Sequence, residues 1–198
     1  MATGRRVGQR FDADHEVTTE ATVFLGRLDP EAIGESLRYA THYEPTPLHE
    51  FEALMEMTTI PAKRATFVDL GCGMGRVVLL AASRPFTRVI GVDFSPAMCR
   101  IARDNIARYK GRLKCPDVKI ARRDAALYPL PKGDLIVYLF NPFRGPVLTS
   151  VVKRLARHDG ELNVIYHTPL GRRTFECRDE FEIVGERAYA VVYRKGRR

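Results

Sequence analysis

The segment Val68–Arg76, which reads VDLGCGMGR, limits the folds available to this chain more than any other feature. An apolar run, Ala65–Leu70, leads into glycines at alternate positions, and a helix-forming run, Arg76–Ser83, follows them. Glycine permits a tight turn and a close approach of the backbone to a ligand, and the N-terminus of a helix attracts an anionic group. We therefore predict a strand, a ligand-binding loop and a helix in succession.

Apolar and helix-forming segments alternate from Ala65 to the end of the chain. The run Asp134–Phe140, DLIVYLF, is apolar almost throughout, which is typical of a strand buried on both faces, and Ser95 and Pro96 favour a helix start. The alternation predicts a mostly parallel sheet with right-handed crossovers, in which ligands bind beyond the carboxyl ends of the strands. The expected strands are 65–70, 88–92, 117–121, 134–140, 162–166, 181–184 and 188–193, and the expected helices are 76–83, 146–156 and one that begins at Ser95.

An acidic residue, Asp93, closes the second expected strand. A carboxylate at this position can accept hydrogen bonds from both ribose hydroxyls of an adenosine, and a helix-capping carboxylate is the alternative. Phe94 follows, and it either packs on the adenine or belongs to the core. The glycine loop and Asp93 together favour an adenosine ligand.

The glycine loop differs from the dinucleotide-binding motif G-x-G-x-x-G. The third glycine of that motif would stand at position 76, where this chain has Arg76, and Gly75 lies one residue earlier. Asp69 lies two residues before the first glycine, and a carboxylate there suits a cationic amino group better than a pyrophosphate. The glycine spacing therefore disfavours a nicotinamide-dependent oxidoreductase.

Two further loops follow strands at the same expected edge of the sheet. Asp124 follows the third strand and could accept a hydrogen bond from an adenine amino group, while the Ala125 N–H donates to a ring nitrogen; a turn aspartate is the alternative. Asn141 follows the fourth strand and offers both a donor and an acceptor, and Pro142 stiffens its loop. Phe143 either forms a flat wall for a substrate or lies in the core.

Over residues 65–193 the chain resembles the class I S-adenosylmethionine-dependent methyltransferases. Its DLGCGMGR loop is similar to the first motif of that family, and Asp93 and Asp124 match the family's ribose and adenine positions. The NPF segment Asn141–Phe143 resembles the NPPY motif of amino-group methyltransferases. It lacks the second proline, which weakens a prediction of adenine or glutamine methylation.

The N-terminal part carries a second likeness. A Phe-Asp pair at residues 11–12 and the YEPTP segment at residues 43–47 resemble a group of small bacterial methyltransferases of uncharacterised substrate. The YEPTP segment is also similar to one that lies over the cofactor in the non-SET lysine methyltransferases. By that likeness Tyr43, Glu44 and Thr46 would border the methionine end of the cofactor; an extended, proline-stiffened connector is the alternative.

The resemblance implies S-adenosyl-L-methionine as the cofactor and a Rossmann-like α/β fold, with a central, mostly parallel, seven-stranded sheet, helices on both faces and an antiparallel last strand. It implies a helical or extended cap region over residues 1–60 and a catalytic domain over residues 61–198. Catalytic roles would fall to Tyr43 and Asn141. The residues implied to bind the cofactor are Thr46, Asp69, Gly71, Cys72, Gly73, Gly75, Arg76, Asp93, Phe94, Asp124, Ala125 and Asn141.

We expect the methyl acceptor to be a small molecule or a protein side chain. A methyltransferase of RNA or DNA is the alternative, because the net charge is +8 and the pI about 9.5. Arginines spread along the chain favour a general basic bias instead, and no added RNA-binding module is apparent. A non-enzymatic module that binds an adenosyl ligand is a third possibility, although no motif looks degraded.

A general base is needed only if the acceptor must lose a proton, and His167 is the best placed candidate because it ends an expected strand. Four scattered cysteines without a CxxC pair predict neither a disulfide framework nor a metal site. The chain has no apolar run of about 20 residues and no signal-like N-terminus, so we expect a cytoplasmic protein without a membrane partner. The candidate bases are His42, His49, His167, Tyr43 and Tyr166.

Overall fold

The computed structural model describes residues 2–20 and 43–197. Within them, seven strands form one sheet in the order β3-β2-β1-β4-β5-β7-β6. Strands β1 to β5 are parallel, and β7 runs antiparallel to both β5 and β6. This topology confirms the expected Rossmann-like fold. The strands are β1 (Ala65–Leu70), β2 (Arg88–Asp93), β3 (Val118–Arg122), β4 (Asp134–Phe140), β5 (Leu162–His167), β6 (Glu182–Arg187) and β7 (Ala190–Lys195).

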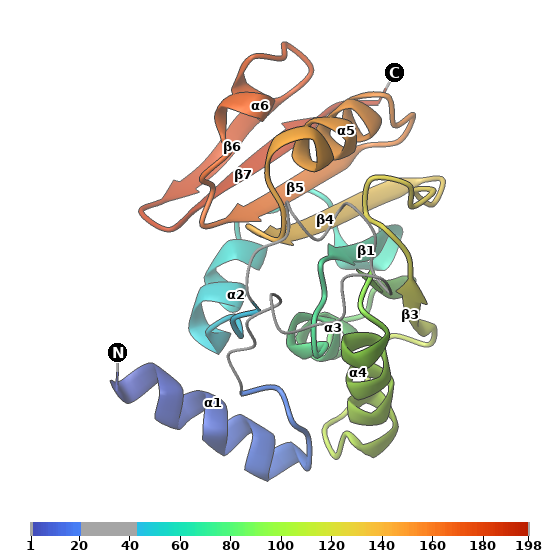
Figure 1. The fold of residues 1–198 in the computed structure, drawn as a ribbon. Coiled ribbons are helices and arrows are strands. Elements are labelled where there is room, and N and C mark those ends of the chain that lie inside the picture. The colour runs from blue at the N-terminus through green and yellow to red at the C-terminus, as the bar shows by residue number, and fades with distance from the viewer. Residues whose placement is uncertain (1, 21–42, 198) are drawn as a thin grey trace.

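Helices cover both faces of the sheet (Figure 1). Helices α2, α3 and α4 lie on one face, and α5 and the short α6 lie on the other (Figure 1). Among the described residues, no helix is both long and apolar enough to cross a membrane. The helices are α1 (Ala2–His15), α2 (Leu48–Met55), the 3-10 turn η4 (Ala62–Arg64), α3 (Arg76–Ala82), α4 (Pro96–Arg108), α5 (Gly145–Ala156) and α6 (Arg173–Glu176).

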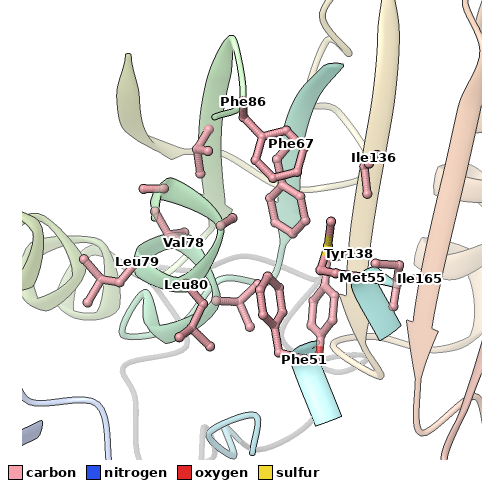
Figure 2. Packing of buried hydrophobic residues seen from close by; sticks show 14 of the residues in the cluster. Phe51, Met55, Phe67, Val78, Leu79, Leu80, Phe86, Ile136, Tyr138 and Ile165 are labelled. Atoms are coloured by element: carbon pink, nitrogen blue, oxygen red, sulfur yellow. The ribbon is translucent and has the colours of Figure 1, made fainter. Parts of the chain in front are cut away.

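The core on the α2–α3 face is rich in aromatic rings (Figure 2). Phe67 of β1 lies 5.2 Å from Phe86 and 6.2 Å from Phe51 of α2, measured between ring centroids, and Phe51 lies 6.1 Å from Tyr138 of β4. All four side chains are almost fully buried. Burial of each such side chain contributes about 1.5–3 kcal/mol, so α2 is part of the same core as the sheet. The expected division of the chain at residue 60 stays a prediction.

The element bounds agree with expectation except near the C-terminus. Helix α4 begins as expected: Ser95 caps it, and its hydroxyl accepts a hydrogen bond from the Met98 N–H at 3.3 Å. Strands β6 and β7 each end two or three residues later than expected. Pairing of Arg187 with Ala190 across a tight turn extends β6, and pairing of Arg194 and Lys195 with β5 extends β7. These end residues are polar, so an apolar pattern does not reveal them.

Candidate cofactor site

The glycine loop lies between two other segments of the chain. Gly71 (φ 88°) and Gly73 (φ 51°) both adopt left-handed backbone conformations, which favour glycine. A Cβ atom on Gly71 would lie 2.3 Å from the Cβ of Pro142, and one on Gly73 would lie 2.1 Å from the Cδ2 of Tyr43. The loop thus packs against the segment after β4 on one side and against the N-terminal part of the chain on the other.

A cleft of about 850 Å³, part of it open to solvent, lies at the carboxyl ends of β1, β2 and β4. This is the edge at which parallel sheets bind ligands. Of the residues implied to act here, Gly75 and Asn141 do not line the cleft. Those that line it are Tyr43, Thr46, Asp69, Gly71, Cys72, Gly73, Arg76, Asp93, Phe94, Asp124 and Ala125.

Asp93 connects the end of β2 to the glycine loop. Its Oδ2 accepts a hydrogen bond from the Gly73 N–H at 3.0 Å, and its Oδ1 accepts one from the Ser95 N–H at 2.8 Å. The side chain of Ser95 caps α4, so Asp93 is not the helix cap. Burial raises the pKa of Asp93, and these two N–H donors oppose the rise. A carboxylate has about four lone-pair sites, so Asp93 can still accept ribose hydroxyls.

Asp69 places a second carboxyl group in the cleft. Its side chain is buried, and burial, followed by the negative charge of Asp93, raises the pKa of Asp69 well above its usual value. A cation bound nearby would oppose this rise in pKa, because it favours the charged form of the carboxyl group. Asp69 and Asp93 therefore fit a ligand that carries a cationic group beside an adenosine.

An Asp69→Asn substitution is expected to stabilise the free protein and weaken cofactor binding. The pKa of Asp69 is higher in the folded than in the unfolded chain, so its contribution to stability falls as pH rises above about 3.8. At pH 7 we expect the variant to gain about 1–3 kcal/mol of unfolding free energy and to bind S-adenosylmethionine about tenfold more weakly. Thermal unfolding at pH 3.5 and pH 7 checks the first effect, because the gain should vanish at the lower pH. Calorimetric titration checks the second.

Asp124 combines a turn contact with a place in the cleft wall. Its Oδ1 accepts a hydrogen bond from the Ala126 N–H at 2.8 Å, which is the contact of an Asx turn. Asp124, Ala125 and Phe94 all line the cleft near Asp93. The structure thus brings together the residues implied to hold an adenine, and the turn explains why an aspartate suits position 124.

Arg76 directs its guanidinium group to the N-terminal segment. Its Nε donates to Thr19 Oγ1 at 2.6 Å, its Nη1 to Glu20 Oε2 at 2.7 Å and its Nη2 to Asp12 Oδ1 at 3.2 Å. The Arg76 side chain is only 3% exposed. Although Arg76 borders the cleft, these contacts make it an anchor for residues 8–20, a role that its place in the loop motif did not reveal.

Tyr43 and Asn105 connect the same N-terminal segment to the glycine loop. The Tyr43 hydroxyl donates to the Thr19 carbonyl at 2.9 Å, and Asn105 Nδ2 donates both to the Thr18 carbonyl and to the Met74 carbonyl at 2.9 Å. Burial raises the pKa of Tyr43 above its usual value, so its hydroxyl stays neutral. Tyr43 is therefore suited to packing and donating rather than to acting as a base.

Tyr138 is a cleft residue that the sequence pattern did not single out. It lies within β4, is fully buried, and its hydroxyl lies 3.0 Å from Thr46 Oγ1. Burial raises the pKa of Tyr138 well above its usual value. The sequence did offer a signal for Tyr138, because it places a hydroxyl group inside an otherwise apolar strand. A buried tyrosine hydroxyl needs a hydrogen-bond partner. The pair joins the YEPTP segment to the sheet beside the cleft.

Residues at the end of β4 and shortly after it form part of the cleft wall. Asn141 has φ 39°, a left-handed conformation that asparagine tolerates better than most residues. Its neighbours Phe140, Pro142 and Phe143 line the cleft, and Phe143 is also buried against the core on the α5 face. Phe143 therefore belongs to the core and also lines the cleft, while its role as a wall for a substrate stays a prediction.

The candidate bases do not meet at one point of the cleft. His167 is buried, and its Nε2 lies 2.6 Å from Glu50 Oε2, so it links β5 to α2. Burial lowers the pKa of His167, while the bond to Glu50 opposes the shift. His49 is exposed, and the Tyr166 hydroxyl accepts a hydrogen bond from the Gly171 N–H at 3.2 Å. His42 lies outside the described residues.

Comparison with known families agrees with this geometry. Residues 67–159 match the model of a family described as "Methyltransferase domain". That range begins within β1 and includes the glycine loop, Asp93 and Asp124. The chain thus carries a class I S-adenosylmethionine-dependent methyltransferase domain.

Individual relatives are distant. A Methanocaldococcus jannaschii protein, whose name proposes a protein N5-glutamine methyltransferase, is 24% identical over 108 residues, which are 54% of this chain and 51% of that protein. The chain thus matches about half the length of this curated relative. Among solved structures, a Pyrococcus horikoshii OT3 protein has a TM-score of 0.57 at 18% identity, covering 76% of this chain and 89% of that one. A geranyl diphosphate C-methyltransferase from Streptomyces coelicolor A3(2) has a TM-score of 0.54 at 16% identity, and the match covers 77% of this chain and 78% of that one. Such identities reflect a shared fold alone.

Proposed function

We propose that this protein is an S-adenosylmethionine-dependent methyltransferase that acts on a small molecule or a protein side chain. The observation that carries the proposal is the contact between Asp93 and Gly73, because it joins the carboxylate that would bind the ribose to the loop that would receive the methionine end. Asp69 lies in the same cleft, and its raised pKa suits a cationic neighbour.

Each part of the cleft has a role in holding the cofactor, which supplies an activated methyl group. Asp93 would accept the ribose hydroxyls, and Asp69 would bind the amino group directly or through water. Free N–H groups at the start of α3 would attract the carboxylate, and Asp124 and Ala125 would hold the adenine. Positioning of two reactants contributes on the order of 7–11 kcal/mol in favourable cases, so these residues would supply much of the rate enhancement. A general base is needed only where the acceptor must lose a proton before or during the attack.

The acceptor would enter past the aromatic wall after β4. Phe140, Pro142 and Phe143 form this side of the cleft, and a flat apolar wall suits an extended side chain or an apolar metabolite. The name of the Methanocaldococcus jannaschii relative, which proposes glutamine side chains as its substrate, supports a protein acceptor. The missing second proline after Asn141 argues against glutamine itself.

Two measurements test the proposal. Calorimetric titration should give micromolar binding of S-adenosylmethionine, and a screen for released S-adenosylhomocysteine against metabolites and peptides should find a turned-over acceptor. Binding without release against any acceptor would favour the non-enzymatic module. Nicotinamide cofactor bound in place of S-adenosylmethionine would contradict the proposal.

A nucleic-acid methyltransferase is a second candidate, and the net charge of +8 favours it. The same screen should then include RNA and DNA. Release of S-adenosylhomocysteine that depends on added nucleic acid and declines steeply with salt would replace the first acceptor class by this one.

A further inference from the structure

Positive charge is concentrated in one stretch of the chain. Residues 100–123 hold nine of the 32 lysines and arginines and two of the 24 acidic residues. This stretch therefore accounts for seven of the eight net positive charges. It extends from α4 through the following loop to the end of β3, an outer strand of the sheet (Figure 1). The nine residues are Arg100, Arg103, Arg108, Lys110, Arg112, Lys114, Lys119, Arg122 and Arg123, and all are exposed.

Contacts place several of these cations on one surface. The Nη2 of Arg103 donates to the Ile120 carbonyl at 3.1 Å, so α4 reaches across to β3. Burial raises the pKa of Cys99 to about 11, and the positive charges of Arg103 and Arg122 act against that rise. Both guanidinium groups therefore lie near Cys99, although they belong to different elements.

An open groove runs beside β3 within this surface. Its basic residues are Arg88, Arg103 and Lys119, and its floor is formed mainly by aliphatic side chains together with the half-buried ring of Tyr128. Asp117 forms ion pairs with Arg88 at 2.6 Å and with Lys119 at 3.1 Å, so part of the positive charge there is balanced. The groove thus combines cations with an apolar, partly aromatic floor.

The basic surface reaches the cofactor cleft. Arg122 ends β3, and Arg123, the next residue, lines the cleft. The Arg123 N–H donates to the Asp93 carbonyl at 2.9 Å, which fixes this end of the surface beside the expected ribose position. A chain bound along the groove would therefore lead to the mouth of the cleft.

We propose that the surface formed by α4 and β3 is a docking site for single-stranded RNA. Repeated cations match a regular row of phosphates, and an aromatic ring in a groove suits the stacking of an unpaired base. A concave groove does not suit the flat surface of a membrane. RNA loops present unstacked bases without the unpairing that a DNA duplex requires, which favours RNA as the occupant.

The docking surface is separate from the reaction. RNA bound here could contain the acceptor or could carry a protein that contains it, so the inference does not depend on which acceptor is methylated. It requires binding alone, and binding is measured without turnover. Failure of methyl transfer would therefore not be mistaken for failure of docking.

Fluorescence anisotropy with a labelled 20-nucleotide single-stranded RNA of mixed sequence tests the proposal on the full chain. We expect micromolar affinity at 50 mM KCl. About five phosphate contacts would lower it roughly a hundredfold by 200 mM KCl. Single-stranded DNA of the same sequence, duplex DNA and vesicles with 30% phosphatidylserine are the comparison ligands. Equal or tighter binding of any of these would overturn the assignment to RNA.

Charge reversal then locates the surface. The variant R103E/K119E/R122E should bind the RNA at least tenfold more weakly and with a smaller salt slope. The matched control K153E/R157E/R173E changes the charge equally, at exposed positions on the other face, and should lose less than about threefold. Equal losses in the two variants would overturn the proposal. Calorimetry with S-adenosylmethionine should give the same affinity for both variants as for the parent chain, which establishes that their cofactor site is folded.

Discussion

An Asp93→Ala variant is expected to bind S-adenosylmethionine at least about a hundredfold more weakly than the parent protein. Hydrogen bonds to a charged group contribute about 1.5–3 kcal/mol each, and Asp93 would make two of them with the ribose. The substitution also leaves the Gly73 N–H and the Ser95 N–H without the carboxylate that accepts them at 3.0 Å and 2.8 Å. Loss of ligand contacts and loss of loop order therefore act in the same direction.

The measurement is calorimetric titration of both proteins, with thermal unfolding as a check of the fold. Asp104→Ala is the matched control, because Asp104 is an exposed carboxylate of α4 outside the cleft. Asp93→Asn, which keeps one oxygen acceptor, should fall between the parent and the alanine variant. An unchanged dissociation constant in a folded Asp93→Ala protein would remove Asp93 from the site and, with it, the main support for the adenosine ligand.

Local sequence patterns sufficed for most of the fold. The apolar run of β4 and the capping pair Ser95 and Pro96 act over a few residues, so their structure follows from neighbours in the chain. Helix α6 spans only Arg173–Glu176, which is too short for a periodic pattern to emerge. Strand pairing extended β6 and β7 beyond their apolar residues, because backbone hydrogen bonds do not depend on side-chain polarity.

The site shows the same division between local and distant causes. The glycine loop and Asp93 were recognisable because their chemistry resides in residue type and spacing. The role of Arg76 was not, since its partners Asp12 and Glu20 lie 64 and 56 positions away in the sequence. The basic surface was missed for another reason: charge was judged over the whole chain, whereas a count in a short window isolates residues 100–123.

Arg76→Met is expected to have the largest effect on stability. The Arg76 side chain is buried, and its partners Asp12 and Glu20 are only 15% and 13% exposed. Removing one member of a buried ionic cluster leaves uncompensated charge and costs about 3–5 kcal/mol. For a chain of this size that loss corresponds to a fall in Tm of roughly 6–20 °C. Arg88→Met is the control, because Arg88 pairs with Asp117 at the surface and surface pairs contribute less than about 1 kcal/mol.

The same substitution should also weaken cofactor binding, and this second effect separates an anchoring role from a merely stabilising one. Thr19 accepts a hydrogen bond from Arg76 through its hydroxyl and one from Tyr43 through its carbonyl. Tyr43 in turn packs on Gly73. Release of the N-terminal segment would therefore free Tyr43 and loosen the loop, and we expect S-adenosylmethionine affinity to fall about tenfold at a temperature where Arg76→Met is still folded. Arg76→Lys, which keeps the charge but not all four hydrogen bonds of the guanidinium group, should recover part of the stability. A destabilised Arg76→Met protein with parental affinity would show that the N-terminal segment supports the fold without shaping the cofactor site.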